Sequence, residues 1–185
     1  GCSLSVGAVG ILDKLSFRID QPGIYCLIGP NGAGKTSTFN AITGAVPIQE
    51  GTIALDGEGV SGFLPNDVAL RGIGRKFQVP SIFPNLTIAE NLLSALWGGR
   101  CSLTDLFSYT PLNWSSAITT DLRKRFPFLN QDEKPASDLS HGEKQVLELS
   151  MSLLGEPRLL LLDEPCAGLS PEETEKVIDT VRWVR

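Results

Sequence analysis

The chain has 185 residues and a formal net charge of −5, with 42% hydrophobic and 20% charged residues. This length is enough for one globular domain with its own hydrophobic core. The negative charge argues against a nucleic-acid-binding surface, which is normally basic. It does not exclude a phosphate ligand, because backbone N–H groups and one or two lysines can hold phosphates.

The cysteine pattern argues against a metal- or disulfide-stabilised protein, and the lengths of the apolar runs argue against a membrane-spanning one. The chain has four cysteines, none in a C-x-x-C pair, and His141 is its single histidine. We therefore expect neither a zinc site nor a disulfide framework, but reduced thiols as in a cytosolic protein. The sequence contains no run of 18 apolar residues, which is about the length that a membrane-spanning helix needs. The first residues, Gly1-Cys2, follow no methionine, and we interpret them as the start of a trimmed piece.

The first part of the chain predicts two strands and a helix. The short apolar run 24–28 ends at a glycine and predicts a buried strand. A helix is expected over residues 35–41, with Gly44 at its C-terminal cap position. Residues 51–57 alternate between apolar and polar and predict a half-exposed antiparallel strand.

The middle of the chain predicts mainly helices. Thr87 and Glu90 fit a capping box at the start of a helix over residues 88–97. The segment 100–137 is polar and interrupted by proline, so helices can be placed there only loosely. Apolar residues recur with helical spacing over residues 144–154, which predicts a helix with a broad buried face.

The last part predicts a strand and a capped helix. The four leucines 159–162 indicate a fully buried strand of a parallel sheet. Ser170 is the expected N-cap of the last helix, with Pro171 at its first position and Glu173 completing a capping box. Strands that alternate with helices predict an α/β fold, with a parallel core sheet, flanking helices and one antiparallel element.

The strongest motif is the segment 29–36, which fits G-x-x-x-x-G-K-[ST] between a predicted strand and a predicted helix. Its glycines let backbone N–H groups surround phosphates, and the helix N-terminus adds positive potential. Lys35 would contact the β- and γ-phosphates, and Thr36 would bind Mg²⁺. The alternative, a glycine-rich turn with a chance lysine, does not explain this context. The candidate nucleotide-binding residues are Gly29, Pro30, Asn31, Gly32, Ala33, Gly34, Lys35, Thr36 and Ser37.

An acidic pair follows the predicted strand 159–162. The carboxyl ends of parallel strands are where open α/β sheets bind ligands. Asp163 would therefore hold Mg²⁺, directly or through water. Glu164 would orient and polarise the attacking water, as a catalytic residue. By itself such a pair is usually the start of a solvated loop, so this interpretation depends on the phosphate loop.

A third motif at residues 139–145 resembles the signature of the ABC ATPase family, L-S-G-G-Q. Leu139, Ser140 and Gly142 match it, whereas His141 and Glu143 depart from its commonest form. A serine and a glycine at a helix N-terminus can form an anion site, although a serine there can also be a simple N-cap. The resemblance implies that Ser140 and Gly142 contact the γ-phosphate of an ATP bound by a second subunit, in a head-to-tail dimer.

Further segments match other elements of the ABC family. Gln78 matches the Q-loop glutamine, which implies a catalytic role, contact with Mg²⁺ and a link to a helical subdomain that touches a membrane subunit. Residues 168–171 match the D-loop. The resemblance implies a P-loop NTPase fold of the ABC type, with a core subdomain at 1–78 and 138–185 and a helical subdomain at about 79–137.

Within that family, the segments 72–83, 85–87 and 139–142 are similar to the ATPases of urea and branched-chain amino acid importers. The resemblance implies an ATPase that binds ATP and Mg²⁺ and powers solute import. Its partners would be a second ATPase subunit, identical or different, and transmembrane permease subunits. It would lie peripherally at the cytoplasmic face of the inner membrane. The ATPase fold itself does not determine which solute is transported.

The chain departs from the family at two positions. Val6, with Val9 nearby, occupies the place of an aromatic residue that stacks on adenine. The family's switch histidine lies on a strand beyond the acidic pair, and the chain ends at Arg185 before that position. We therefore expect a polypeptide truncated at its C-terminus, which alone binds nucleotide poorly or hydrolyses it slowly.

Two other functions fit the same motifs. One is a non-transport ABC ATPase of DNA repair or translation, although such proteins usually carry coiled-coil insertions or tandem domains. The other is a degenerate nucleotide-binding module without turnover, which the absent switch histidine favours.

Overall fold

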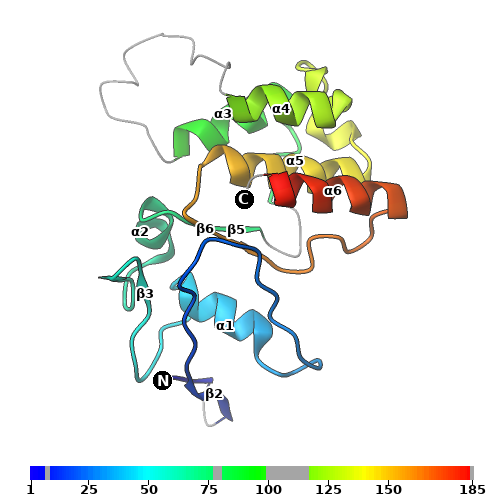
Figure 1. The fold of residues 1–185 in the computed structure, drawn as a ribbon. Coiled ribbons are helices and arrows are strands. Elements are labelled where there is room, and N and C mark those ends of the chain that lie inside the picture. The colour runs from blue at the N-terminus through cyan, green and yellow to red at the C-terminus, as the bar shows by residue number, and fades with distance from the viewer. Residues whose placement is uncertain (7–8, 77–80, 99–116, 184–185) are drawn as a thin grey trace, which may run out of the picture. The chain divides into compact units, whose positions relative to one another are not determined.

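The structure is a computed structural model that describes residues 1–6, 9–76, 81–98 and 117–183 (Figure 1). Gln78 and residues 100–116 of the segment 100–137 lie outside these residues. The chain divides into two compact units, Gly1–Ile73 and Gly74–Val184, and each is described by itself. Among the described residues, no helix has the length and apolar character needed to cross a membrane. The predicted division into core and helical subdomains stays a prediction.

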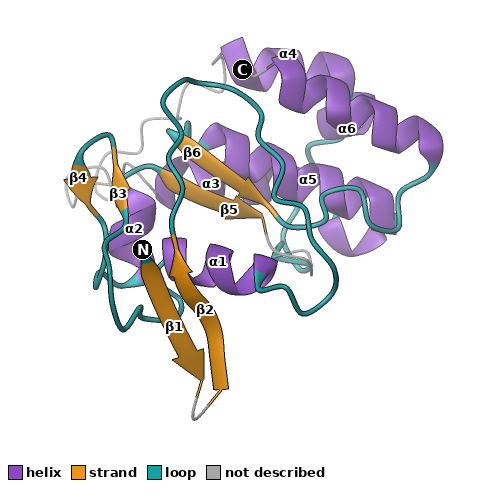
Figure 2. Cartoon of the chain, turned by 60° about the horizontal axis from the view of Figure 1, so that its bottom comes forward, coloured by secondary structure: helices purple, strands orange, loops and turns teal. Residues whose placement is uncertain are grey.

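In the first unit an antiparallel hairpin packs on a helix. The hairpin consists of β1 (Cys2–Val6) and β2 (Val9–Leu15), and its register shifts on either side of Leu4 (Figure 2). Leu4 and Leu12 form a small core with a buried alanine of α1 (Lys35–Ile42). Burial of these side chains fixes the helix against β2.

The bounds of α1 follow from two glycines. Gly34 precedes the helix with φ 84°, and Gly44 follows it with φ 71°. Only glycine adopts such left-handed angles without cost. The N–H of Gly44 donates to Ala41 O at 3.3 Å, and a Cβ at Gly44 would lie 2.4 Å from Phe63 O. The helix predicted at 35–41 and its glycine cap are thus confirmed.

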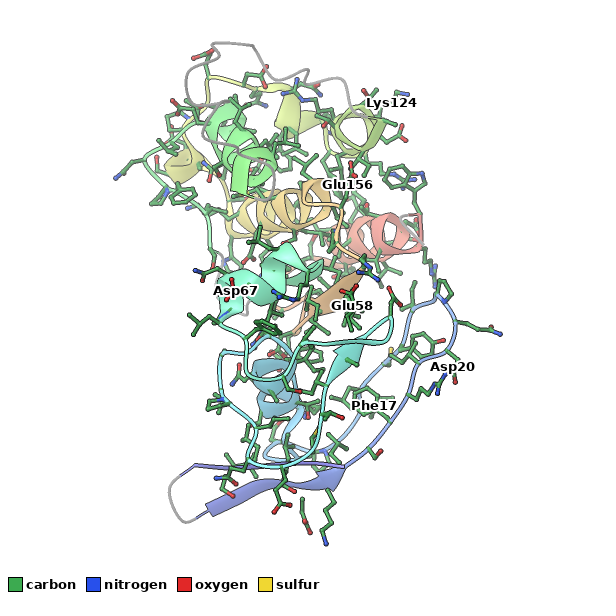
Figure 3. All side chains as sticks on the ribbon, turned by 90° about the vertical axis from the view of Figure 1, so that its left-hand side faces the viewer. Phe17, Asp20, Glu58, Asp67, Lys124 and Glu156 are labelled. Carbon is green, nitrogen blue, oxygen red and sulfur yellow. The ribbon has the colours of Figure 1, made fainter. Side chains whose placement is uncertain are left out.

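The strand predicted at 24–28 is wrong. The segment is irregular and exposed, with Ile28 89% accessible. Figure 3 shows Phe17 and Asp20 on the same long connection between β2 and α1. The backbone N–H and C=O groups of a strand need hydrogen-bond partners on a neighbouring strand. No described strand of the first unit pairs with this segment, so its apolar composition alone does not make it a strand.

The antiparallel strand predicted at 51–57 is confirmed only at Ala54–Leu55, which form β3. This strand pairs with β4 (Glu58–Gly59), beyond the predicted range, through a turn in which Asp56 and Gly57 both have positive φ. Two consecutive left-handed residues are typical of a tight hairpin turn. The helix α2 (Pro65–Leu70) follows in the chain.

A two-stranded sheet joins β5 (Ile73–Lys76) to β6 (Leu159–Leu162). Figure 2 shows both arrows pointing the same way, as expected for parallel strands. The strand predicted at 159–162 is confirmed, but its complete burial is wrong, since only Leu161 is buried. A parallel strand is buried throughout only when elements cover both faces and both edges.

Helices form most of the remaining described part of the second unit, and they pack around an apolar core. The predicted capping boxes are confirmed: Thr87 and Glu90 cap the first helix, and Ser170 and Glu173 cap the last. The helix predicted at 144–154 begins three residues earlier. The elements are α3 (Ile88–Gly98), α4 (Ala117–Arg125), the 3-10 turns Pro127–Asn130 and Ala136–Asp138, α5 (His141–Leu154) and α6 (Pro171–Trp183).

Candidate functional site

The glycine-rich loop forms a cradle in front of α1. Gly32 and Gly34 have φ angles of 83° and 84°, which the loop needs in order to turn into the helix. Gly34 is the N-cap residue, and no side chain caps the helix. The first N–H groups of α1 are therefore available to an anion, which the helix dipole also favours. Thr36 and Ser37 lie in this first turn.

The lysine of the loop is held by backbone carbonyls. Lys35 Nζ donates to Gly29 O and to Pro30 O, each at 2.8 Å. The loop itself closes through a bond from Ala33 N to Pro30 O at 3.2 Å. These two bonds place the ammonium group beside the backbone of the loop. The ammonium group can exchange these neutral acceptors for phosphate oxygens, which bind it more strongly.

The acidic pair follows β6 in the second unit. Asp163 Oδ2 lies 3.5 Å from Arg75 Nη2 of β5, and the two side chains are 15% and 6% exposed. Glu164 has a left-handed backbone with φ 47°. Lys14, Asp56 and Glu156 share this angle, so the backbone alone does not distinguish Glu164 as a functional residue. Sequence reasoning did not identify the role of Arg75, because its partner is 88 residues away.

The signature segment forms the capped start of α5. Ser140 Oγ accepts a bond from Glu143 N at 3.2 Å, and Glu143 Oε2 accepts one from Ser140 N at 2.8 Å. The departure of Glu143 from the family pattern thus completes a capping box. The role of Ser140 as an N-cap is compatible with its proposed role in anion binding, because a capping serine can still present its hydroxyl to an anion at the helix N-terminus.

Gly142 lies against the carboxylate of Glu173. A Cβ there would lie 2.3 Å from Glu173 Oε1, so no larger residue fits unless that carboxylate moves. The pKa of Glu173 is lowered from its ordinary value, mainly by the hydrogen bond from the backbone N–H of Ser170 and also by the Ser170 hydroxyl. The carboxylate at this position therefore stays charged over the neutral range.

The remaining predicted positions give less information. Gln78 lies outside the described residues. Val6 and Val9 are a register pair of the β1–β2 hairpin, and their proposed place beside adenine stays a prediction. The glycine loop belongs to the unit Gly1–Ile73, whereas Ser140, Gly142 and the acidic pair belong to Gly74–Val184.

Comparison with known proteins agrees with these motifs. The family model described as ABC transporter matches residues 12–167. The chain is 32% identical to the high-affinity branched-chain amino acid transport ATP-binding protein LivG of Salmonella typhimurium, covering 100% of this chain and 75% of LivG. It is also 32% identical to the corresponding protein BraF of Pseudomonas aeruginosa, covering 95% of this chain and 71% of BraF.

Solved structures show the same fold. An ATP-binding cassette of an ABC transporter, in its ADP conformation, matches with a TM-score of 0.77 and 26% identity, covering 97% of this chain and 72% of that one. A nucleotide-free cassette matches with a TM-score of 0.75 and 27% identity, covering 97% and 73%. The α/β fold and the similarity to branched-chain amino acid importer ATPases are thus confirmed. The chain belongs to the ABC transporter family, as an ATP-binding cassette.

Proposed function

We propose that this chain binds and hydrolyses ATP to drive solute import by an ABC transporter. The observation that carries the proposal is the cradle before α1, where an uncapped helix N-terminus and the carbonyl-bound Lys35 offer N–H groups and one positive charge. The residues from Gly29 to Ser37 would surround the phosphates. Lys35 would leave the two carbonyls for the β- and γ-phosphates.

We further propose Mg²⁺ as the companion of ATP, held by Thr36, Asp163 and Gln78. The donor chemistry of the two described side chains fits, because hydroxyl and carboxylate oxygens are the ligands that Mg²⁺ prefers. The guanidinium of Arg75, 3.5 Å from Asp163, balances the carboxylate charge and fixes its orientation. Glu164, which directly follows Asp163 and is exposed, would act on the attacking water.

We propose that two copies, or this chain and a related subunit, bind ATP between them. Ser140 and Gly142 would contact the γ-phosphate held by the other subunit, since both lie at the N-terminus of α5. The names of the relatives support branched-chain amino acids as the solute, and urea is the alternative. Permease subunits would recruit the protein to the cytoplasmic face of the membrane.

Nucleotide binding is the direct test, with the full-length gene product and Mg-ATP. Replacement of Lys35 by methionine should abolish most of the thermal stabilisation by ATP, which for the wild type is about 2.7 kcal/mol at 100 times Kd. The exposed Lys14, in the same unit, is the matched control. Equal stabilisation of the wild type and the Lys35→Met variant would contradict the assignment of the cradle.

Turnover is tested separately with Glu164→Gln. The variant should lose ATP hydrolysis and accumulate as an ATP-bound dimer, detectable by size-exclusion chromatography with light scattering. A module without catalytic function would show neither change, and that result would refute hydrolysis as the function.

A further inference from the structure

A buried ion pair lies beneath the functional segments of the second unit. Lys76, the last residue of β5, places its Nζ 3.3 Å from Glu148 Oε2 in α5. The side chains are only 1% and 5% exposed. A charge at such a position is costly unless it is matched, so the pair holds β5 and α5 in one register.

The same carboxylate also holds the chain beyond the Q-loop. Glu148 Oε1 accepts a hydrogen bond from the backbone N–H of Ser81 at 3.0 Å. Lys76 precedes Gln78 by two positions, and Ser81 follows it by three. One side chain of α5 therefore holds both Lys76 and Ser81.

Gln145 connects this pair to the segment after the acidic residues. Its Oε1 accepts a bond from Lys76 Nζ at 3.2 Å, and its Nε2 donates to Ala167 O at 2.8 Å. Ala167 lies three positions after Glu164, on the way to the D-loop. The buried amide group of Gln145 thus bonds on both sides and ties β5 to the loop that follows the proposed catalytic residue.

The network ends at the signature histidine. Nε2 of Gln145 lies 3.2 Å from His141 Nε2. A Cβ at Gly168 would lie 3.0 Å from the same ring atom, so the ring lies against the D-loop backbone. His141, which departs from the usual signature glycine, therefore bridges the start of α5 and the D-loop.

We propose that Lys76, Glu148 and Gln145 are positioning residues that hold the end of β5 and the loop after Glu164 on the signature helix α5. The network holds the end of β5, the start of α5 and the loop after Glu164 together, so that a displacement of one of them is passed on to the others. This inference rests on the proposed ATPase function. The glycine loop that would hold the phosphates belongs to the other unit, so we expect the three side chains to act on the rate of hydrolysis and not on ATP affinity.

The test compares two double variants of the full-length gene product. Lys76→Met/Glu148→Met removes both buried charges together, which avoids leaving one unpaired. The control, Lys176→Met/Glu172→Met, removes an exposed ion pair of α6 whose atoms are 3.1 Å apart. For each we would measure the kcat and KM of Mg-ATP hydrolysis and the Tm.

The buried double variant should lose about 10- to 100-fold in kcat, as for displaced catalytic groups, while its KM stays within about threefold of the wild type. The control should keep both constants. A kcat within about twofold of the wild type, or a loss of kcat that only follows a fall in Tm, overturns the proposal. If the buried double variant does not fold, Gln145→Met is measured with the same two criteria.

The experiment distinguishes an error in the proposed network from an error in the proposed ATPase function. A wild-type protein that hydrolyses ATP beside a fully active buried variant overturns only the network. A wild-type protein that neither hydrolyses ATP nor gains Tm with Mg-ATP overturns both.

Discussion

Three glycines with nearly the same backbone angle allow the geometry of the phosphate cradle to be tested quantitatively. Gly34 has φ 84°, Gly32 has φ 83° and Gly57 has φ 85°. A Cβ at Gly34 would lie 2.9 Å from Leu12 Cδ2, whereas a Cβ at either of the other two would meet no atom within 4 Å. The three positions therefore share one backbone cost and differ in packing.

Substitution by alanine separates these two contributions. The left-handed backbone alone costs about 1–2 kcal/mol, which is the effect expected for Gly57→Ala. Gly34→Ala adds the contact with the buried Leu12, and overpacking costs a further ~1–3 kcal/mol. We expect Gly34→Ala to lower the free energy of unfolding by about 2–5 kcal/mol, and Gly32→Ala by about as much as Gly57→Ala.

Urea titration followed by circular dichroism measures these differences. The double variant Gly34→Ala/Leu12→Ala tests the contact itself, because removal of the leucine should make the cost of alanine at position 34 equal to that at Gly57. If Gly34→Ala and Gly57→Ala destabilise the wild type equally, the close approach of β2 to the loop does not constrain this glycine. Mg-ATP binding should be lost in Gly34→Ala and kept in Gly57→Ala.

Three further results are expected. The pKa of Glu173 is lowered by its bonds from Ser170, so its folded-state pKa lies below its unfolded-state pKa. Its stabilisation is therefore complete above the unfolded-state value and lost as the pH falls through the folded-state value, and Glu173→Gln should remove this part of the Tm–pH curve. Burial raises the pKa of the Cys166 thiol, so iodoacetamide should label it more slowly than the exposed Cys26, as mass spectrometry would show. Lys76→Met, which leaves a buried carboxylate unpaired, should destabilise the protein by about 3–5 kcal/mol in urea titrations, and a loss below ~1 kcal/mol would contradict its burial.

The sequence by itself determined the features that depend on near neighbours. Each capping box joins residues three positions apart, so the starts of α3 and α6 could be predicted from four residues each. The helix after the glycine loop is similarly local, because the backbone angles of Gly34 and Gly44 set its bounds. The candidate site could be found for the same reason, since each motif is a continuous segment.

Tertiary structure alone decided the features that need a distant partner. The run 24–28 has the composition of a strand, but no described strand of its unit pairs with it. The contact of Arg75 with Asp163 spans 88 residues, and that of Lys76 with Gln145 spans 69. No local pattern distinguishes a buried lysine at a strand end from a solvated one. The difference is made by the carboxylate and the amide that α5 brings to it, because a buried charge is stable only beside such partners.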